Sequence, residues 1–134
     1  FSEAPVENFY APLLEGDDFN PQRVNVADQR ADPHSLFNTI RHMIAVRKRH
    51  PVFGRGDFAW IGDNPHVAAY LRSYAGEQVL IVNNLSDKTQ TVCFEVNKLD
   101  GSPIDLLTGR VLSDVIDHKL TLRLQPYAYL WLKI

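Results

Sequence analysis

The segment VNVADQRADPHSLFNTIRHMIAVRKRHPVFGRG, residues 24–56, decides how this chain is organised. Asp32 is a favourable N-cap residue, and Pro33 suits the first helical position because an N–H there would have no partner. His50 precedes Pro51, and proline disfavours the helical conformation of the residue before it, so the helix is expected to end there. Between these signals, apolar residues recur at spacings of three and four and predict a single stripe: Leu36, Phe37, Ile40, Met43 and Ile44, with Arg47.

Residues 1–31 show no sustained periodicity and are predicted to form a long loop before this helix. Loops of this length are unusual inside a compact domain unless they are functional or disordered. A disordered tail would hold fewer aromatic and apolar residues than this segment has: Phe1, Phe9, Tyr10, Leu13, Leu14 and Phe19. We therefore expect the loop to pack against a part of the protein that lies outside this chain.

After Pro51 the hydrophobic period changes from 3.6 to 2, which is typical of strands. Residues 79–82 are apolar on both faces, as in a central strand, whereas residues 119–124 alternate cleanly. Short strands separated by frequent turns predict a mainly β fold, an antiparallel β-sandwich. The predicted strands are Gly56–Ile61, His66–Tyr74, Gln78–Asn83, Gln90–Val96, Ile104–Leu107, Lys119–Leu124 and Ala128–Ile134.

Composition excludes several classes of partner. A formal net charge of −2 and a pI near 6.2 give no reason to expect binding to nucleic acid or to an anionic membrane. The basic run from Arg47 to His50 is explained by the last helical turn, where cations complement the helix dipole. The single cysteine, Cys93, excludes an internal disulfide and fits a reducing compartment, so we expect a cytoplasmic protein in which Cys93 is a small packed residue.

Few residues are candidates for a metal-binding or catalytic site. The acidic cluster of Glu15, Asp17 and Asp18 lacks the spacing and turn glycine of a calcium-binding EF-hand loop, and a solvated loop explains it better. The histidines show no zinc-binding spacing, and Ser35 is expected to lie in the first helical turn and to reinforce the cap. No carboxylate pair can be nominated for glycoside hydrolysis. We expect no metal, no cofactor and no catalytic residue in this chain.

An aromatic row offers the clearest candidate surface. Tyr127, Tyr129 and Trp131 occupy alternate positions of the last predicted strand and share one face, and Trp60 adds a second indole. Such a row can stack sugar rings, or it can pack the sandwich core or a neighbouring domain. Packing is favoured, because large aromatic side chains dominate cores and interfaces generally. Trp60 and Trp131 remain candidates for carbohydrate stacking.

Several motifs together resemble the C-terminal portion of α-amylase superfamily enzymes (glycoside hydrolase family 13), most closely the trehalose synthases. The segment RHMIAVRKRHPVFGRGDF at residues 41–58 is the most specific of them. The others are Phe1-Ser2, VNVADQ at 24–29, DPHSL at 32–36, VAAYLRSY at 67–74, VNNLS at 82–86, LLTGR at 106–110 and LQPYAYLWLKI at 124–134. The resemblance covers essentially the whole chain.

This resemblance implies a domain arrangement. Residues 1–50 would be the end of a catalytic (β/α)8 barrel, namely the loop after the eighth strand and the final helix, and residues 51–134 would be a C-terminal β-sandwich domain. Loops after barrel strands lie on the active-site face, which makes Phe1 and Asn25 candidates for substrate contact. The nucleophilic Asp, the acid/base Glu and the second Asp of the family would all precede Phe1, so no residue here inherits those roles.

A parent enzyme of this kind would interconvert maltose and trehalose by intramolecular transglucosylation with retention, can bind calcium, and can form a homo-oligomer. This chain would be a non-catalytic fragment that stabilises the barrel. The segment VENFYAPLLEGDDFNPQ at residues 6–22 is not the usual spacer of the family, which leaves an α-glucosidase, an α-amylase or another transglucosylase open as the parent. An autonomous carbohydrate-binding module is a further alternative.

Overall fold

The computed structural model describes residues 5–11, 16, 20, 23–95, 102–112 and 115–134. The chain divides into two compact units, Phe1–Ala45 and Val46–Ile134. The expected domain boundary at residue 50 stays a prediction about the larger protein. No helix in the described part of the chain is both long enough and apolar enough to cross a membrane.

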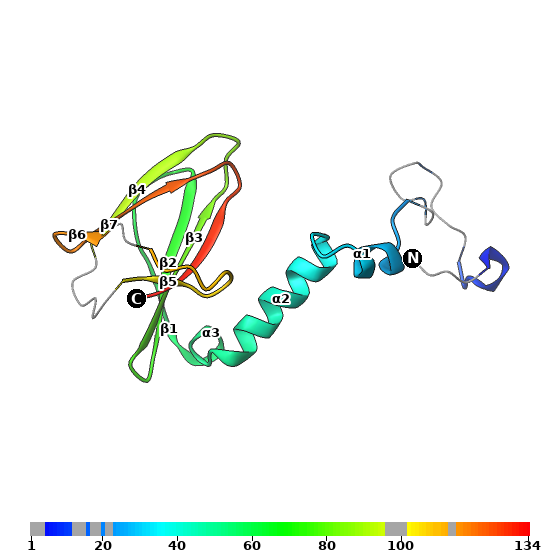
Figure 1. Ribbon diagram of the computed structural model, residues 1–134, viewed down its shortest axis with the longest axis horizontal. Helices are drawn as coiled ribbons and strands as arrows, with labels where there is room; N and C mark the ends of the chain where they lie inside the picture. Colours follow the sequence, from blue (N-terminus) through cyan, green and yellow to red (C-terminus); the bar gives the residue numbers. More distant parts are fainter. Residues whose placement is uncertain (1–4, 12–15, 17–19, 21–22, 96–101, 113–114) are drawn as a thin grey trace. The chain divides into compact units, whose positions relative to one another are not determined.

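The N-terminal segment contains short helices, so the prediction of one continuous loop over residues 1–31 is wrong. A 3-10 helix, η1, spans Val6–Asn8, and an α-helix, α1, spans Val26–Ala31 (Figure 1). Helices this short show too few turns for a hydrophobic period to be visible in the sequence. The acidic cluster of Glu15, Asp17 and Asp18 lies outside the described residues.

The main helix, α2, spans Leu36–Arg49 and therefore begins three residues after the predicted Pro33. Asp32 does not cap it, because the backbone N–H of Asp32 donates to the carbonyl of Asp28 at 3.0 Å and closes α1 instead. Ser35 takes the N-cap position of α2 and lies outside its first turn: its carbonyl accepts from the N–H of Thr39 and its Oγ accepts from the N–H of Asn38 at 3.2 Å.

The apolar stripe of α2 is present but remains largely uncovered in this chain. Leu36 is 71% exposed, Ile40 is 46% exposed and Ile44 is 48% exposed. Val46, in contrast, is fully buried. A helix with such a stripe normally buries it against other elements.

Pro51 is followed by a further short helix, α3, which spans Val52–Arg55 and was not predicted from the sequence. Its C-cap is Gly56, whose N–H donates to the carbonyl of Val52 at 3.0 Å. The backbone at Gly56 is so close to this turn that an added Cβ would lie 2.5 Å from the Val52 oxygen. Glycine is therefore required where the chain leaves α3 for the first strand.

The strands form an antiparallel β-sandwich, as predicted (Figure 1). The five-stranded sheet has the order β1-β2-β3-β8-β5, and the three-stranded sheet has the order β4-β7-β6. The first sheet contains β1 (Asp57–Trp60), β2 (Val67–Tyr74), β3 (Glu77–Asn84), β8 (Tyr129–Lys133) and β5 (Ile104–Asp105). The second contains β4 (Gln90–Glu95), β7 (Lys119–Leu124) and β6 (Val115–Ile116).

The core of the sandwich lies between the two sheets. Strand β7 shows the alternation cleanly, because Leu120, Leu122 and Leu124 are buried while their neighbours are exposed. The predicted central strand is confirmed, since residues 79–82 of β3 are buried on both faces. The buried core residues are Ala69, Leu80, Val82, Val92, Phe94, Leu112, Leu120, Leu122, Leu124 and Leu132.

Apart from small shifts at strand ends, the structure differs from the predicted strands in three places. The strand predicted from Ile104 to Leu107 is only the two-residue β5, because Leu106 begins a turn. Strand β6 was not predicted. Tyr127 precedes the last strand and lies in a turn with a positive φ of 57°, so it does not share a strand face with Tyr129 and Trp131.

Candidate functional site

A cluster of three aromatic rings lies on the outer face of the five-stranded sheet, at its β1 edge. Phe58 and Trp60 occupy alternate positions of β1 and therefore point to the same face. Tyr70 on β2 lies directly opposite Trp60 in the antiparallel register, which brings the third ring to the same place. We call Phe58, Trp60 and Tyr70 the aromatic surface.

Two of the three ring pairs of the aromatic surface meet edge to face, whereas the Phe58 and Tyr70 centroids are 4.9 Å apart at 30°. The Phe58 and Trp60 centroids are 5.1 Å apart at 87°, and the Trp60 and Tyr70 centroids are 5.6 Å apart at 75°. Trp60 is nevertheless 68% exposed and Phe58 is 47% exposed. The result is an apolar surface that is internally packed and open to solvent.

Arg72 borders the aromatic surface and joins it to α3. Its guanidinium lies 6.0 Å from the Phe58 ring centroid, within the range of a cation–π contact. The same group donates to the carbonyl of Val52 at 3.3 Å and to the carbonyl of Phe53 at 3.1 Å. These bonds fix the guanidinium on the backbone of α3.

The aromatic surface continues into a packed region beneath α3. There Val52, Val79 and Ile81 are fully buried, and Tyr70 is among the partly buried residues that pack against them. Trp131 belongs to this region: its ring centroid is 4.6 Å from that of Phe53. One face of the sheet is thus covered by α3 at its centre and uncovered at the β1 edge.

The other predicted site residues lie apart from this surface. Asn25 caps α1: its Oδ1 accepts from the N–H of Asp28 at 2.8 Å, and its Nδ2 donates to the carboxylate of the same residue at 2.6 Å. Its side chain is therefore engaged in local structure. Phe1 lies outside the described residues. Trp60 and Trp131 are on the same sheet face, but only Trp60 exposes most of its ring.

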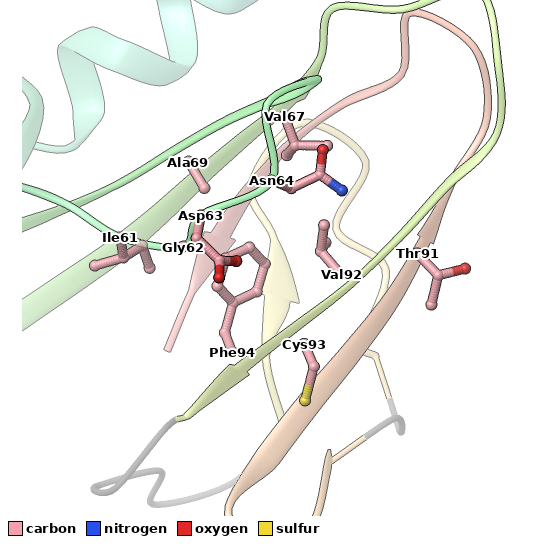
Figure 2. A pocket seen from close by; sticks show the side chains of 10 residues that line it. All are labelled: Ile61, Gly62, Asp63, Asn64, Val67, Ala69, Thr91, Val92, Cys93 and Phe94. Carbon is pink, nitrogen blue, oxygen red and sulfur yellow. The ribbon is translucent and has the colours of Figure 1, made fainter.

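A pocket of about 230 Å³, which was not predicted from the sequence, lies between the loop after β1 and strand β4 (Figure 2). Its polar side chains include Asp63 and Asn64, and the Oδ1 of Asn64 accepts from the N–H of His66 at 2.8 Å. The lining residues are Ile61, Gly62, Asp63, Asn64, Val67, Ala69, Thr91, Val92, Cys93 and Phe94. Within the described residues, no group of three or more His, Cys, Asp or Glu side chains is placed to hold a metal ion.

Cys93 is exposed, so the prediction that it is a packed residue is wrong. It lies between Val92 and Phe94, which both point into the core, and a strand alternates its side chains between faces. Its sulfur is on the outer face of the three-stranded sheet, 3.8 Å from the Oγ1 of Thr121. Strand alternation outweighs the general tendency of cysteine to be buried.

Comparison with known proteins matches this chain to a C-terminal domain family and to parts of longer proteins. Residues 58–131 match the family described as "Maltogenic Amylase, C-terminal domain". The chain is 35% identical over 132 residues to a trehalose synthase of Thermus thermophilus, covering 96% of this chain and 14% of that protein. It is 40% identical over 116 residues to the trehalose synthase/amylase TreS of Mycobacterium tuberculosis, covering 83% of this chain and 19% of that protein.

A solved structure has a similar fold. Trehalulose synthase MutB from Pseudomonas mesoacidophila superimposes with a TM-score of 0.67 at 27% identity, covering 85% of this chain and 20% of that chain. The chain spans about 14% to 24% of the length of the trehalose synthases that it matches. These findings confirm the family resemblance: the chain belongs to the maltogenic amylase C-terminal domain family of glycoside hydrolase family 13.

Proposed function

We propose that this chain is the non-catalytic C-terminal part of a trehalose-synthase-like enzyme, and that its aromatic surface docks onto the catalytic barrel of that enzyme. The observation that carries the proposal is the exposure of Trp60 and Phe58 on a sheet face whose centre is already packed under α3. An apolar surface next to a region that is already packed is suited to contact with a further apolar protein surface. The barrel is the nearest available protein, because most of the length of the relatives lies outside this chain.

The energetics support a covered surface. Burial of apolar area contributes about 25 cal/mol per Å², so covering a large aromatic side chain contributes on the order of 2 kcal/mol. Contiguous exposed apolar patches usually mark interaction sites. Together Phe58 and Trp60 therefore offer a few kcal/mol of docking energy, which is a large fraction of the stability of an ordinary domain.

The stripe on α2 supports the same function independently. Leu36, Ile40 and Ile44 lie at helical spacing and are all exposed. Helices with one such stripe are typically stabilised by packing of that stripe rather than by intrinsic propensity. We expect the stripe to be part of the barrel, as the final helix of such an enzyme would be.

The activity of the parent is proposed from the relatives. Relatives that are 31–40% identical over at least 83% of this chain are named trehalose synthases. The parent is therefore expected to interconvert maltose and trehalose by retaining transglucosylation, with catalytic carboxylates supplied by the barrel. An α-glucosidase parent is the alternative, since a probable α-glucosidase of Rhizobium meliloti is 29% identical over 98 residues. Incubation of the full-length polypeptide with maltose decides between them: trehalose formation supports the proposal, and glucose as the sole product contradicts it.

Sugar binding is a second candidate function, favoured by the open face of Trp60. Against it, two of the three ring pairs of the aromatic surface meet edge to face, and the guanidinium of Arg72 is already bound to two carbonyls of α3. The centre of a protein–protein interface is mainly apolar and has few charged groups, and the aromatic surface has this composition.

Maltose titration separates the two candidates. Trp60 is solvent-exposed, so a sugar stacked on its ring would change its fluorescence in the 134-residue chain. We expect no saturable change for the chain or for a Trp131→Phe variant, which leaves Trp60 as the sole tryptophan. A saturable change that disappears in Trp60→Phe would contradict docking as the role of the aromatic surface.

The docking itself is tested in the full-length polypeptide. Trp60→Ala and Phe58→Ala are expected to lower its thermal stability and to leave KM for maltose unchanged, because neither residue is proposed to contact substrate. Thr121→Ala, on the exposed face of the other sheet, is the matched control and should change neither quantity. Equal stability of all three variants would contradict the proposal.

A further inference from the structure

Side-chain hydrogen bonds join α1 to the first turn of α2. The side-chain amide of Asn38, in α2, donates to three backbone carbonyls at the end of α1: to Gln29 at 2.9 Å, to Arg30 at 3.2 Å and to Asp32 at 2.8 Å. The last carbonyls of a helix have no partner within that helix. Asn38 therefore caps α1 from the neighbouring helix.

Gln29, in α1, makes the reciprocal bond to α2. Its Oε1 accepts from the backbone N–H of Phe37 at 3.2 Å, and the N–H groups of the first helical turn have no partner within their own helix. Its carbonyl accepts from the Oγ of Ser35, which is buried at the N-cap position of α2. Each helix thus caps one end of the other. We call Gln29, Ser35 and Asn38 the helix joint.

Packing contributes little to the position of α1. The helix has six residues, and none of them is buried. A helix of this length is not stable by itself in water. A cation–π contact of Arg30 with the Phe37 ring, at 5.6 Å, adds a weaker contact with α2. The hydrogen bonds of the helix joint therefore set the position of α1 on α2.

The place of α1 in the parent enzyme follows from the proposed function, on which this inference rests. If α2 is the final helix of a (β/α)8 barrel, α1 lies in the segment that connects the last barrel strand to that helix. Segments that follow barrel strands build the active-site face of these barrels. The helix joint would then attach part of the active-site entrance to the final barrel helix.

The reaction proposed for the parent depends on how well that entrance is closed. Cleavage of maltose transfers its glucosyl group to a barrel carboxylate and frees one glucose. In isomerisation, the anomeric hydroxyl of this glucose attacks the anomeric carbon of the glucosyl ester, its proton passes to the acid/base residue, and the carboxylate leaves. If water attacks the same carbon, a second glucose is released instead. A closed entrance excludes water and retains the first glucose.

We propose that Gln29 and Asn38 are positioning residues for this reaction. By fixing α1 on α2 they keep the active-site entrance closed during the transfer, and they thereby favour isomerisation over hydrolysis. Both side chains are engaged in bonds between the two helices, so they act through α1 and not by contact with the substrate. Loss of these bonds shifts the product from trehalose to glucose with no change at the catalytic carboxylates.

The ratio of trehalose to glucose that the full-length polypeptide forms from maltose tests this role. Gln29→Ala removes the acceptor of the Phe37 N–H, and Asn38→Ala removes the donor to α1. Each is expected to raise the glucose share by about threefold to tenfold, the range that the loss of one hydrogen bond produces. Gln29→Glu keeps an acceptor for that N–H and should keep the ratio of the unchanged enzyme. The matched control is His34→Ala, because His34 is exposed in the turn between the helices and its side chain takes no part in the helix joint.

Hydrogen exchange gives a second readout that does not depend on activity. Backbone amides of residues 26–31 should exchange about threefold to tenfold faster in Gln29→Ala and Asn38→Ala, because α1 opens more often without the helix joint. His34→Ala should leave their exchange unchanged. The product ratio itself does not depend on how much of a variant folds, because each active molecule makes both products.

Three results would overturn this proposal while the proposed function stands. In the first, the unchanged enzyme forms trehalose and the alanine variants at Gln29 and Asn38 keep its product ratio, so the helix joint has only a structural role. In the second, His34→Ala shifts the ratio as much as they do. The third is unchanged exchange of residues 26–31 in both variants. An unchanged enzyme that releases only glucose would contradict the proposed function itself, and this inference with it.

Discussion

The side-chain amide of Asn84, at the end of β3, donates to the carbonyl of Gln125 at 2.9 Å, just beyond the end of β7. This bond joins one sheet of the sandwich to the other. The same Nδ2 donates to the carbonyl of Lys88 at 2.7 Å, and the Oδ1 accepts from the N–H and the Oγ of Ser86. Asn84 is 2% exposed, so one buried amide holds both sheets and the turn that leads to β4.

We predict that Asn84→Ala lowers the free energy of unfolding by about 2–4 kcal/mol, because buried carbonyl and hydroxyl groups lose their partner. The adjacent Asn83 provides a matched control. Among the described residues its Nδ2 bonds only to the carbonyl of Ala68, at 3.5 Å, and Asn83→Ala should cost about 1 kcal/mol or less. Urea denaturation of both variants measures the difference, and equal losses would show that Asn84 does not join the sheets.

A second prediction concerns the glycines around α3. Gly56→Ala would place a Cβ 2.5 Å from the Val52 oxygen and 3.0 Å from the Ser73 oxygen, so the backbone must shift. We expect a loss of about 1–3 kcal/mol in the free energy of unfolding. Gly54→Ala, two residues earlier, meets no atom of the described residues within 4 Å and should stabilise α3 slightly, by about 0.5 kcal/mol. A stability change of the same sign for both variants in thermal unfolding would refute this account of Gly56.

A third prediction concerns Arg72. Arg72→Met keeps much of the aliphatic length but removes the hydrogen bonds to the carbonyls of Val52 and Phe53, and we expect a loss of about 1–3 kcal/mol. Arg72→Lys should restore only part of it, because an ammonium lacks the planar fork that reaches both oxygens. Amide hydrogen exchange at Gly56, whose N–H bonds to Val52, reports on α3 itself. Unchanged exchange at Gly56 in Arg72→Met would show that Arg72 does not hold α3.

The sequence predicted those parts of the fold that repeat over several residues. The alternation of β7 and the doubly apolar centre of β3 identified both strands, and the spacing of Leu36, Ile40 and Ile44 identified α2. The start of α2 was misplaced because Asp32 and Ser35 are both good capping residues. Which of the two caps α2 depends on α1, because the N–H of Asp32 is already bonded to the last turn of α1. The sequence did not show this because α1 is too short to recognise from its hydrophobic period.

Only part of the aromatic surface could be predicted from the sequence. Trp60 stood out as a tryptophan in a strand, and its spacing from Phe58 shows that the two share a face. The contribution of Tyr70 depends on the register between β1 and β2, which the length of the intervening loop does not specify. Trp131 was grouped with Trp60 because both are tryptophans. In the structure Trp131 packs against Phe53 of α3 instead, and α3 was not predicted because Pro51 was interpreted as the end of helical structure.

Hydroxyl-radical footprinting of Trp60 tests the central claim most directly. The modification rate of each aromatic side chain is measured by mass spectrometry in the 134-residue chain and in the full-length polypeptide. Trp60 is 68% exposed in this chain, and docking predicts that its rate falls at least several-fold in the full-length protein. Tyr127, which is 66% exposed in the turn before β8, is the internal reference. Equal rates at Trp60 in both proteins would contradict a barrel docked on the aromatic surface.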